Sequence, residues 1–289
     1  MRRFNGKLWA LTAALLLCAL ALTACGGDEA PAEGDGGQEA AYVVLEDALE
    51  EEEYGISWRN EDIALGLKVQ EILDEMIADG TAAEISNKWF GADILIKDAD
   101  YYEESEAPEG DTSLDDLLSR GKLVVGLDDS FPPMGFRDEN GDIVGFDIDL
   151  AAEVCQRLGV ELELQPIDWD AKELELSSGK VDCLWNGLTV TDERLGAMYF
   201  TKPYIANRQV IIVPSGSDIQ DRTGLAGKIV GLQKGSSALD ALMKDPVYNE
   251  VKEINEYADN VTAFLDLKAG RLEAFVVDEV AGRYIIENN

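Results

Sequence analysis

The sequence predicts an α/β fold in which short buried strands alternate with helices. Four short runs are rich in β-branched and other apolar residues, and helical stretches such as 149–158 separate them. This alternation is typical of βαβ units and of a mainly parallel sheet. With 289 residues, the chain is long enough to bury a core and to form two lobes. The runs are KLVVGL (122–127), VIIVP (210–214), KIVGLQ (228–233) and AFVVD (274–278).

Two helices and a linker are predicted ahead of these strands. Apolar residues recur at helical spacing from Leu65 to Ile77, and Gly80 supplies a C-terminal stop. A second, shorter helix is expected from Thr81 to Phe90. The next segment, 98–112, is acidic, lacks periodicity and contains proline and glycine. It predicts a linker.

The first 40 residues have the parts of an export signal followed by a tether. Three basic residues within the first seven positions precede an apolar run from Leu8 to Leu22. This run is shorter than the roughly 20 residues that a spanning helix needs, so residues 1–25 are expected to be a signal peptide. Residues 26–40 are rich in glycine, alanine and acid, which predicts a flexible acidic tether.

The end of the apolar run resembles a lipoprotein cleavage site. LTAC, ending at Cys25, is similar to the bacterial lipobox. That resemblance implies that Cys25 receives lipid, becomes the mature N-terminus and anchors the protein to the outer side of the cell membrane. An incidental cysteine in a plainly secreted chain is the alternative.

Composition argues against several classes of function. The chain has 24 basic and 58 acidic residues, a net charge of -34. Such a surface repels phosphates, so no nucleic acid partner is expected. No histidine is present, which removes the usual general base and the commonest metal ligand. We therefore expect no metal, no cofactor and no catalytic residues.

Two features of the body complete the analysis of the residues alone. Cys155 and Cys183 lack the spacing of a zinc site, and either a disulfide or two separately buried thiols would explain them. The segment DENGD, 138–142, predicts a hairpin turn, because it lacks the glycine and the distal glutamate of a calcium loop.

A family resemblance begins at GFDIDLAAEVCQRL, residues 145–158. On its own this segment is a helix with acids in its first turn. It also resembles the signature of the family 3 bacterial solute-binding proteins, which bind polar amino acids for ABC importers. The similarity extends over four segments, 121–150, 181–204, 228–238 and 274–282.

The resemblance implies a fold and a function. The fold is a two-lobed type II periplasmic-binding fold, each lobe a mainly parallel sheet flanked by helices. The function is to bind a free amino acid, with a polar one favoured, between two hinged lobes and to deliver it to an ABC transporter permease. A monomer is expected. Two alternatives are a dehydratase of the cyclohexadienyl type on the same fold and a ligand-sensing protein.

Two charged residues match the family positions that hold the ends of an amino acid. A zwitterion buried in a cleft needs partners for both charges, because an unpaired buried charge costs several kcal/mol. Arg194 matches the family arginine that grips the α-carboxylate. Asp278 matches the family acid that pairs with the α-ammonium. A surface ion pair and a helix cap are their respective alternatives.

Seven further positions match family contacts to the ligand. Three follow a strand and lend backbone and hydroxyl groups, two stand at a helix start, and two read the ligand side chain. In that order they are Asn186, Gly187 and Thr189; Ser236 and Ser237; Asp128 and Phe131. An ordinary strand exit, helix capping and core packing of Phe131 are the alternatives. Asp128 favours polar or cationic ligands, whereas Trp185 is expected in the core.

The order of the segments departs from the family. Residues 41–91 look like the end of a family member yet precede its beginning, and YIIENN stands where the family would continue with such a segment. We expect a circular permutation, with a rearranged or misassembled gene as the alternative. The linker 98–112 spans up to about 50 Å when extended. On this interpretation lobe 1 comprises 54–97 and 113–204, and lobe 2 comprises 205–289 and 41–53.

Overall fold

The structure is a computed structural model that describes residues 41–102 and 106–288. The predicted signal peptide, the tether and Cys25 lie outside the described residues. Within the described part, no helix is long and apolar enough to cross a membrane. The predicted α/β fold is confirmed.

Helices and strands alternate over most of the described residues. The helices are α1 (Ile63–Asp79), α2 (Thr81–Phe90), α3 (Ser113–Arg120), α4 (Phe146–Leu158), α5 (Lys172–Ser177), α6 (Asp192–Leu195), α7 (Ser237–Lys244), α8 (Asn260–Lys268) and α9 (Glu279–Asn288). The strands are β1 (Tyr42–Val44), β2 (Glu50–Trp58), β3 (Lys122–Leu127), β4 (Ser130–Phe131), β5 (Gly135–Arg137), β6 (Ile143–Val144), β7 (Glu161–Pro166), β8 (Cys183–Thr189), β9 (Tyr199–Phe200), β10 (Ile205–Pro214), β11 (Ile229–Gln233), β12 (Glu253–Tyr257) and β13 (Ala274–Asp278).

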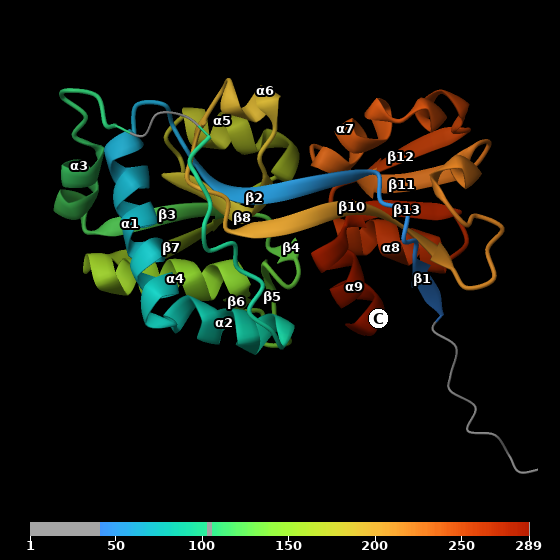
Figure 1. Cartoon of the computed structure of the whole chain (residues 1–289), viewed down its shortest axis with the longest axis horizontal. Coiled ribbons are helices and arrows are strands. Elements are labelled where there is room, and N and C mark those ends of the chain that lie inside the picture. The colour runs from blue at the N-terminus through green and yellow to red at the C-terminus, as the bar shows by residue number, and fades with distance from the viewer. Residues whose placement is uncertain (1–40, 103–105, 289) are drawn as a thin grey trace, which may run out of the picture. The chain divides into compact units, whose positions relative to one another are not determined.

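One large sheet passes through both lobes in the order β12-β11-β13-β10-β2-β8-β3-β7. The outer three strands at each end are parallel, as predicted. The two central strands, β2 and β10, run antiparallel to each other and to their other neighbours. Figure 1 shows these two strands side by side as they cross between the lobes. Here lobe 1 is the side that contains β7, β3 and β8, and lobe 2 the side that contains β12, β11 and β13.

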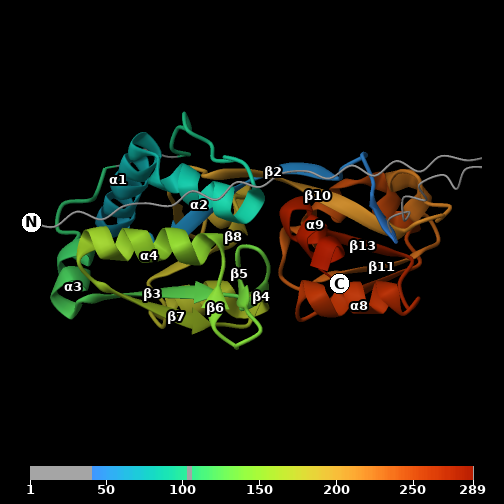
Figure 2. The ribbon, with the colours of Figure 1, turned by 90° about the horizontal axis from the view of Figure 1, so that it is seen from below.

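Helices cover the lobe 1 sheet and confirm the predicted helical segments. Figure 2 shows α1, α2 and α4 together on one side of this lobe. The apolar spacing noted above places Leu65, Val69 and Met76 in the core. Gly80 ends α1 in a left-handed conformation with φ 90°, and α2 has the predicted bounds. On the edge of the lobe, DENGD forms the predicted turn between β5 and β6.

The lobe 2 sheet is covered on both faces. Alternate residues of a strand point to opposite faces, and β10 places Val210 and Ile212 in the cluster that also contains α8 and α9 residues. Its intervening residues, Ile211 and Val213, pack in a second cluster with residues of α7. The region around β10 is therefore buried on two sides.

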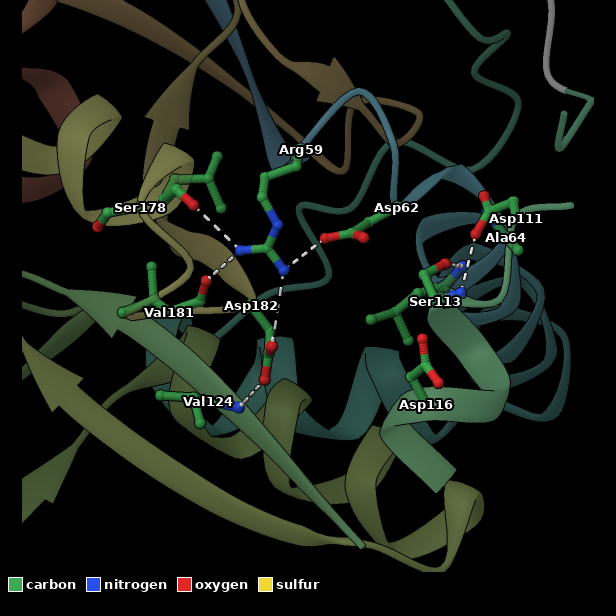
Figure 3. Close-up of polar contacts among 12 residues, drawn as sticks. Arg59, Asp62, Ala64, Asp111, Ser113, Asp116, Val124, Ser178, Val181 and Asp182 are labelled. Carbon is green, nitrogen blue, oxygen red and sulfur yellow. Dashed lines mark hydrogen bonds and ion pairs between the residues drawn. The ribbon is translucent and has the colours of Figure 1, made fainter. Parts of the chain in front are cut away.

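Residues at the end of the segment predicted as a linker cap α1. Asp62, the residue before this helix, makes no side-chain cap. Instead, an Asp111 carboxylate oxygen accepts a hydrogen bond from the Ala64 backbone N–H at 2.7 Å, and the Ser113 hydroxyl accepts from Leu65 N–H at 3.1 Å (Figure 3). Because the first N–H groups of a helix have no partner within it, these contacts tie α1 to the start of α3.

Arg59 fixes the end of β2 in lobe 1. Its guanidinium donates to the backbone carbonyls of Val181 at 2.6 Å and Leu176 at 3.0 Å, and it pairs with Asp62 (Figure 3). Asp182 lies beside this group and accepts from Val124 N–H at 2.8 Å. The end of β2 and the start of α1 are thus built into lobe 1 and are not an appendage.

Cys155 and Cys183 are both buried free thiols. This outcome agrees with the second of the two alternatives that the sequence left open.

Candidate functional site

A cavity lies between the two lobes, where the carboxyl ends of several strands meet. Parallel strands of an α/β sheet bring side chains together at this edge. Eight of the nine predicted ligand contacts line it, together with two residues that were not predicted. Its lining residues are Asp128, Phe131, Trp169, Gly187, Thr189, Arg194, Gln233, Ser236, Ser237 and Asp278.

Arg194 is a buried cation without an acidic partner. It lies on α6, directly after β8, and 8% of its surface is exposed. One guanidinium nitrogen donates to the Thr189 carbonyl at 2.7 Å, and the other donates to the Gly235 carbonyl at 3.3 Å. Within the described part of the chain it forms no ion pair. Burial lowers its pKa, yet an arginine stays protonated in proteins. The cavity is therefore lined by a positive charge that an anionic group of a ligand could pair with.

Asp278 lies across the cavity at the end of β13. One of its carboxylate oxygens accepts hydrogen bonds from the Tyr54 hydroxyl and the Asn207 amide, both at 2.7 Å. Burial raises the pKa of this carboxyl, since the ionised form loses hydration. Its two partners come from β2 and β10, the strands that cross between the lobes.

Asp128 is held by residues from both lobes. It follows β3, and one carboxylate oxygen accepts from the Ser130 backbone and hydroxyl at 2.9 and 2.5 Å. The other accepts from the Gln233 amide of lobe 2 at 2.7 Å. The Asn186 amide oxygen accepts from the Asp128 backbone N–H at 3.0 Å. Asn186 therefore does not line the cavity but fixes the backbone of Asp128 through this hydrogen bond.

Glycines allow the closest approaches at the site. Gly187 has φ 59°, and a Cβ there would lie 2.8 Å from the Phe131 ring. Gly235 has φ 71°, and a Cβ there would lie 2.8 Å from the Asp170 backbone of the opposite lobe. The Gly235 carbonyl also accepts from Lys172 at 2.7 Å. A side chain at either position would collide with its neighbour in a conformation that favours glycine.

The predicted serines and threonine form a chain of hydroxyl contacts. Ser236 caps α7 and accepts from Ala238 N–H at 3.3 Å, so the capping role is present and the residue also faces the cavity. Ser237 donates to the Thr189 hydroxyl at 3.1 Å across the lobes. Thr189 in turn donates to Glu52 at 3.1 Å.

Sequence reasoning missed three residues at or beside the cavity. Trp169 lines it from a short 3-10 turn after β7, and Gln233 lines it from the end of β11. The position of Gln233 at a strand end was a usable signal. Glu52 is buried and accepts a hydrogen bond from Thr189, the last member of the chain of hydroxyl contacts. Because it is one of four consecutive glutamates, the sequence does not indicate which of them faces inward.

Residues 123–266 match the model of the bacterial extracellular solute-binding proteins, family 3. The chain belongs to this family. The resemblance noted in the sequence is thereby confirmed. The described residues contain no group of three or more acidic or cysteine side chains arranged to hold a metal ion.

Curated relatives are similar over part of their length. An L-cystine-binding protein of Escherichia coli is 31% identical over 176 residues, which is 60% of this chain and 65% of that protein. A lysine/arginine/ornithine-binding periplasmic protein of Escherichia coli is 35% identical over 158 residues, which is 54% of this chain and 60% of that protein. The chain therefore spans less than two thirds of the length of these relatives.

Solved structures share the two-lobed fold. A Streptococcus pneumoniae ABC uptake transporter substrate-binding protein with bound histidine is 37% identical, with a TM-score of 0.60 over 63% of this chain and 75% of that one. Holo ArgBP from T. maritima is 39% identical, with a TM-score of 0.56 over 61% of this chain and 76% of that one. An ancestral amino-acid-binding protein, described as a precursor of cyclohexadienyl dehydratase, is 34% identical with a TM-score of 0.57, over 60% of this chain and 77% of that one.

Proposed function

We propose that this family member binds a free amino acid between its lobes and delivers it to the permease of an ABC importer. One observation carries the proposal: a buried guanidinium without an acidic partner, Arg194, faces the same cavity as a buried carboxyl, Asp278. An amino-acid zwitterion carries the two complementary charges. Arg194 would hold its carboxylate in the bidentate geometry that guanidinium favours, and Asp278 would accept from its ammonium.

Closure of the lobes would be the signal that the permease reads. The ligand contacts come from both lobes, so a bound ligand favours the closed arrangement over an open one. An amino acid has about ten heavy atoms, and a ceiling of about 1.5 kcal/mol per atom leaves ample room for the roughly 8 kcal/mol of micromolar binding. No catalytic step is required.

The cavity favours a polar or cationic ligand side chain. Asp128 and Gln233 offer an acid and an amide, and Phe131 and Trp169 offer aromatic walls. Relatives named for cystine, for lysine, arginine and ornithine, and for histidine support the same class. In this proposal Gly187, Thr189, Ser236 and Ser237 supply backbone and hydroxyl contacts, and Asn186 positions Asp128.

A thermal-shift panel tests the binding proposal. The protein, starting at Gly26, is melted with each of the twenty amino acids and with cystine. At a thousand times its dissociation constant, a ligand adds about 4 kcal/mol to the free energy of unfolding, which raises the melting temperature by several degrees. A cooperative melt that no amino acid shifts would contradict the proposal. A separate assay incubates the protein with prephenate or arogenate, where the appearance of the ultraviolet absorbance of an aromatic product would favour the dehydratase alternative.

We also propose that the chain is a circular permutant of the family order. Helix α9 packs against β1, so the two pieces of lobe 2 meet where the family chain would be continuous. The segment before the linker supplies central strand β2. Residues 113–289 make up about the same share of the chain as the solved structures cover. The proposed lobes remain 54–97 with 113–204, and 205–289 with 41–53, joined through 98–112.

A lipid anchor on Cys25 completes the proposal. In bacteria grown with radiolabelled palmitate, we expect the wild-type protein to carry label and to sediment with membranes. Cys25→Ser should lose both properties, because the thiol is the site of acylation. Cys18→Ser, which removes a thiol within the apolar run, is the matched control and should keep both. Equal labelling of the two variants would exclude Cys25 as the acylation site, and a wild-type protein without label would argue for secretion without an anchor.

A further inference from the structure

Glu52 is a buried acid that the proposed binding contacts leave unused. It lies on β2, where it is paired in register with Asn207 of β10, and Gln209 of β10 is paired with Asp278 of β13. The Asn207 amide nitrogen donates both to Glu52 at 3.1 Å and to Asp278 at 2.7 Å. One amide group therefore holds two carboxyl groups close together at the ammonium end of the proposed site.

This cluster has more hydrogen-bond acceptors than donors. One Glu52 oxygen accepts from Thr189, Asn207 and Gln209 at 3.0 to 3.1 Å. The amide oxygens of Asn207 and Gln209 are buried and accept no hydrogen bond from the described residues. Buried polar groups are nearly always paired. A proton on one of the two carboxyl groups would supply a donor that the cluster lacks.

Burial and one of the neighbouring charges favour such a proton. The carboxylate charge of Asp278 on β13 favours a proton on Glu52. Arg194 of α6 and Lys244 of α7 are cations that oppose it, but neither forms an ion pair with Glu52 in the described part of the chain. Tyr54 of the same strand is neutral and donates to Asp278. Burial, and then the charge of Asp278, raise the pKa of Glu52 to about 7. Two carboxyl groups this close hold one proton between them near neutral pH.

We infer that Glu52 is a proton-carrying positioning residue, which is protonated in the unliganded protein and loses its proton when the ligand ammonium binds beside Asp278. The inference rests on the proposed function. The Glu52 O–H bond breaks, its electron pair stays on the carboxylate, and the proton passes to a buffer base, while the ammonium stays intact. Glu52 also borders grooves on the outer side of β2 with Glu51 and Tyr102, which gives the proton a route to water.

Isothermal titration in buffers of different ionisation enthalpy tests this step. The probe is the amino acid that gives the largest thermal shift in the panel. At pH 6.5 the wild-type protein should release about half a proton or more per ligand, because a group with a pKa of about 7 is mostly protonated there. Glu52→Gln should release less than about a tenth. Glu51→Gln, an exposed change on the same strand, should release as much as wild type.

The affinity of the wild-type protein should also depend on pH. Because the unliganded state binds the extra proton, the association constant should rise up to tenfold per pH unit from pH 5.5 to about 7 and level off by pH 8. Glu52→Gln should flatten this profile. Glu52→Asp keeps a carboxyl group on a side chain shorter by one methylene. This variant should therefore still release a proton on binding, but the midpoint of its pH profile should shift.

Several results would overturn the inference. Equal proton release by wild type and Glu52→Gln would assign the proton to another group, such as Asp128. A wild-type protein that binds without release and with a flat profile would leave the binding function intact and remove this step alone. If Glu52→Gln fails to fold, the test relies on Glu52→Asp. An affinity–pH profile with the same midpoint in Glu52→Asp as in wild type would then contradict the inference. Absence of binding heat with every amino acid would instead contradict the proposed function.

Discussion

Arg194→Ala is expected to weaken amino-acid binding by about a hundred- to ten-thousand-fold, the equivalent of roughly 3 to 5 kcal/mol. The ligand carboxylate would still be withdrawn from water on closure of the lobes, but it would no longer meet a cation. Titration calorimetry measures the loss directly. In the melting panel at the same ligand concentration, the stabilisation that the ligand causes in wild type should fall to about a third or less.

The size of the effect depends on the guanidinium and not only on its charge. Arg194→Lys keeps a cation but loses the planar fork that pairs with a carboxylate through two hydrogen bonds, so we expect an intermediate loss. Arg137→Ala removes an exposed guanidinium that pairs with Asp129 and does not line the cavity, and it should leave affinity within about twofold, as is usual for exposed ion pairs. If Arg194→Ala bound as tightly as Arg137→Ala, the carboxylate would be held elsewhere.

Much of the cavity could be predicted because its contacts are local in sequence. Gly187, Thr189 and Arg194 lie within one strand, its exit and the following turn, so a motif carries all three. The placement of Asn186 differs for a simple reason. Alternate side chains of a strand face opposite ways, and its amide turns toward the Asp128 backbone.

The residues that could not be predicted depend on pairing between distant strands. Glu52 is one of four consecutive glutamates, and only its register with Asn207, 155 residues away, places it beside Asp278. The antiparallel direction of β2 and β10 is equally invisible in local patterns, because it results from the chain crossing between lobes. Apolar periodicity predicts that a strand exists and is buried. It does not specify the neighbour.

Removal of the segment before the linker is expected to abolish folding. A chain of residues 113–289 alone lacks β2, which lies between β10 and β8 and contributes Tyr54, Ile56 and Trp58, all fully buried. Its loss opens the middle of the sheet and leaves β10 and β8 each with one unpaired edge. We expect no cooperative urea transition and no binding. A cooperative transition like that of the full chain would mean that 41–97 is dispensable, contrary to its position in the core.

The same segment moved to the other end should restore the protein. Residues 113–289 followed by 41–97 reproduce the family order, and α9 already packs against β1. This chain should bind the same amino acids in the same order of affinity. Its urea midpoint should be higher by a few tenths molar, the equivalent of about 1 kcal/mol. The reason is that the native order leaves both pieces of lobe 2 to dock through a long loop, whose closure costs entropy. Equal midpoints would contradict the stability argument, whereas loss of binding would contradict the permutation itself, because the order of the segments would then matter to the cavity.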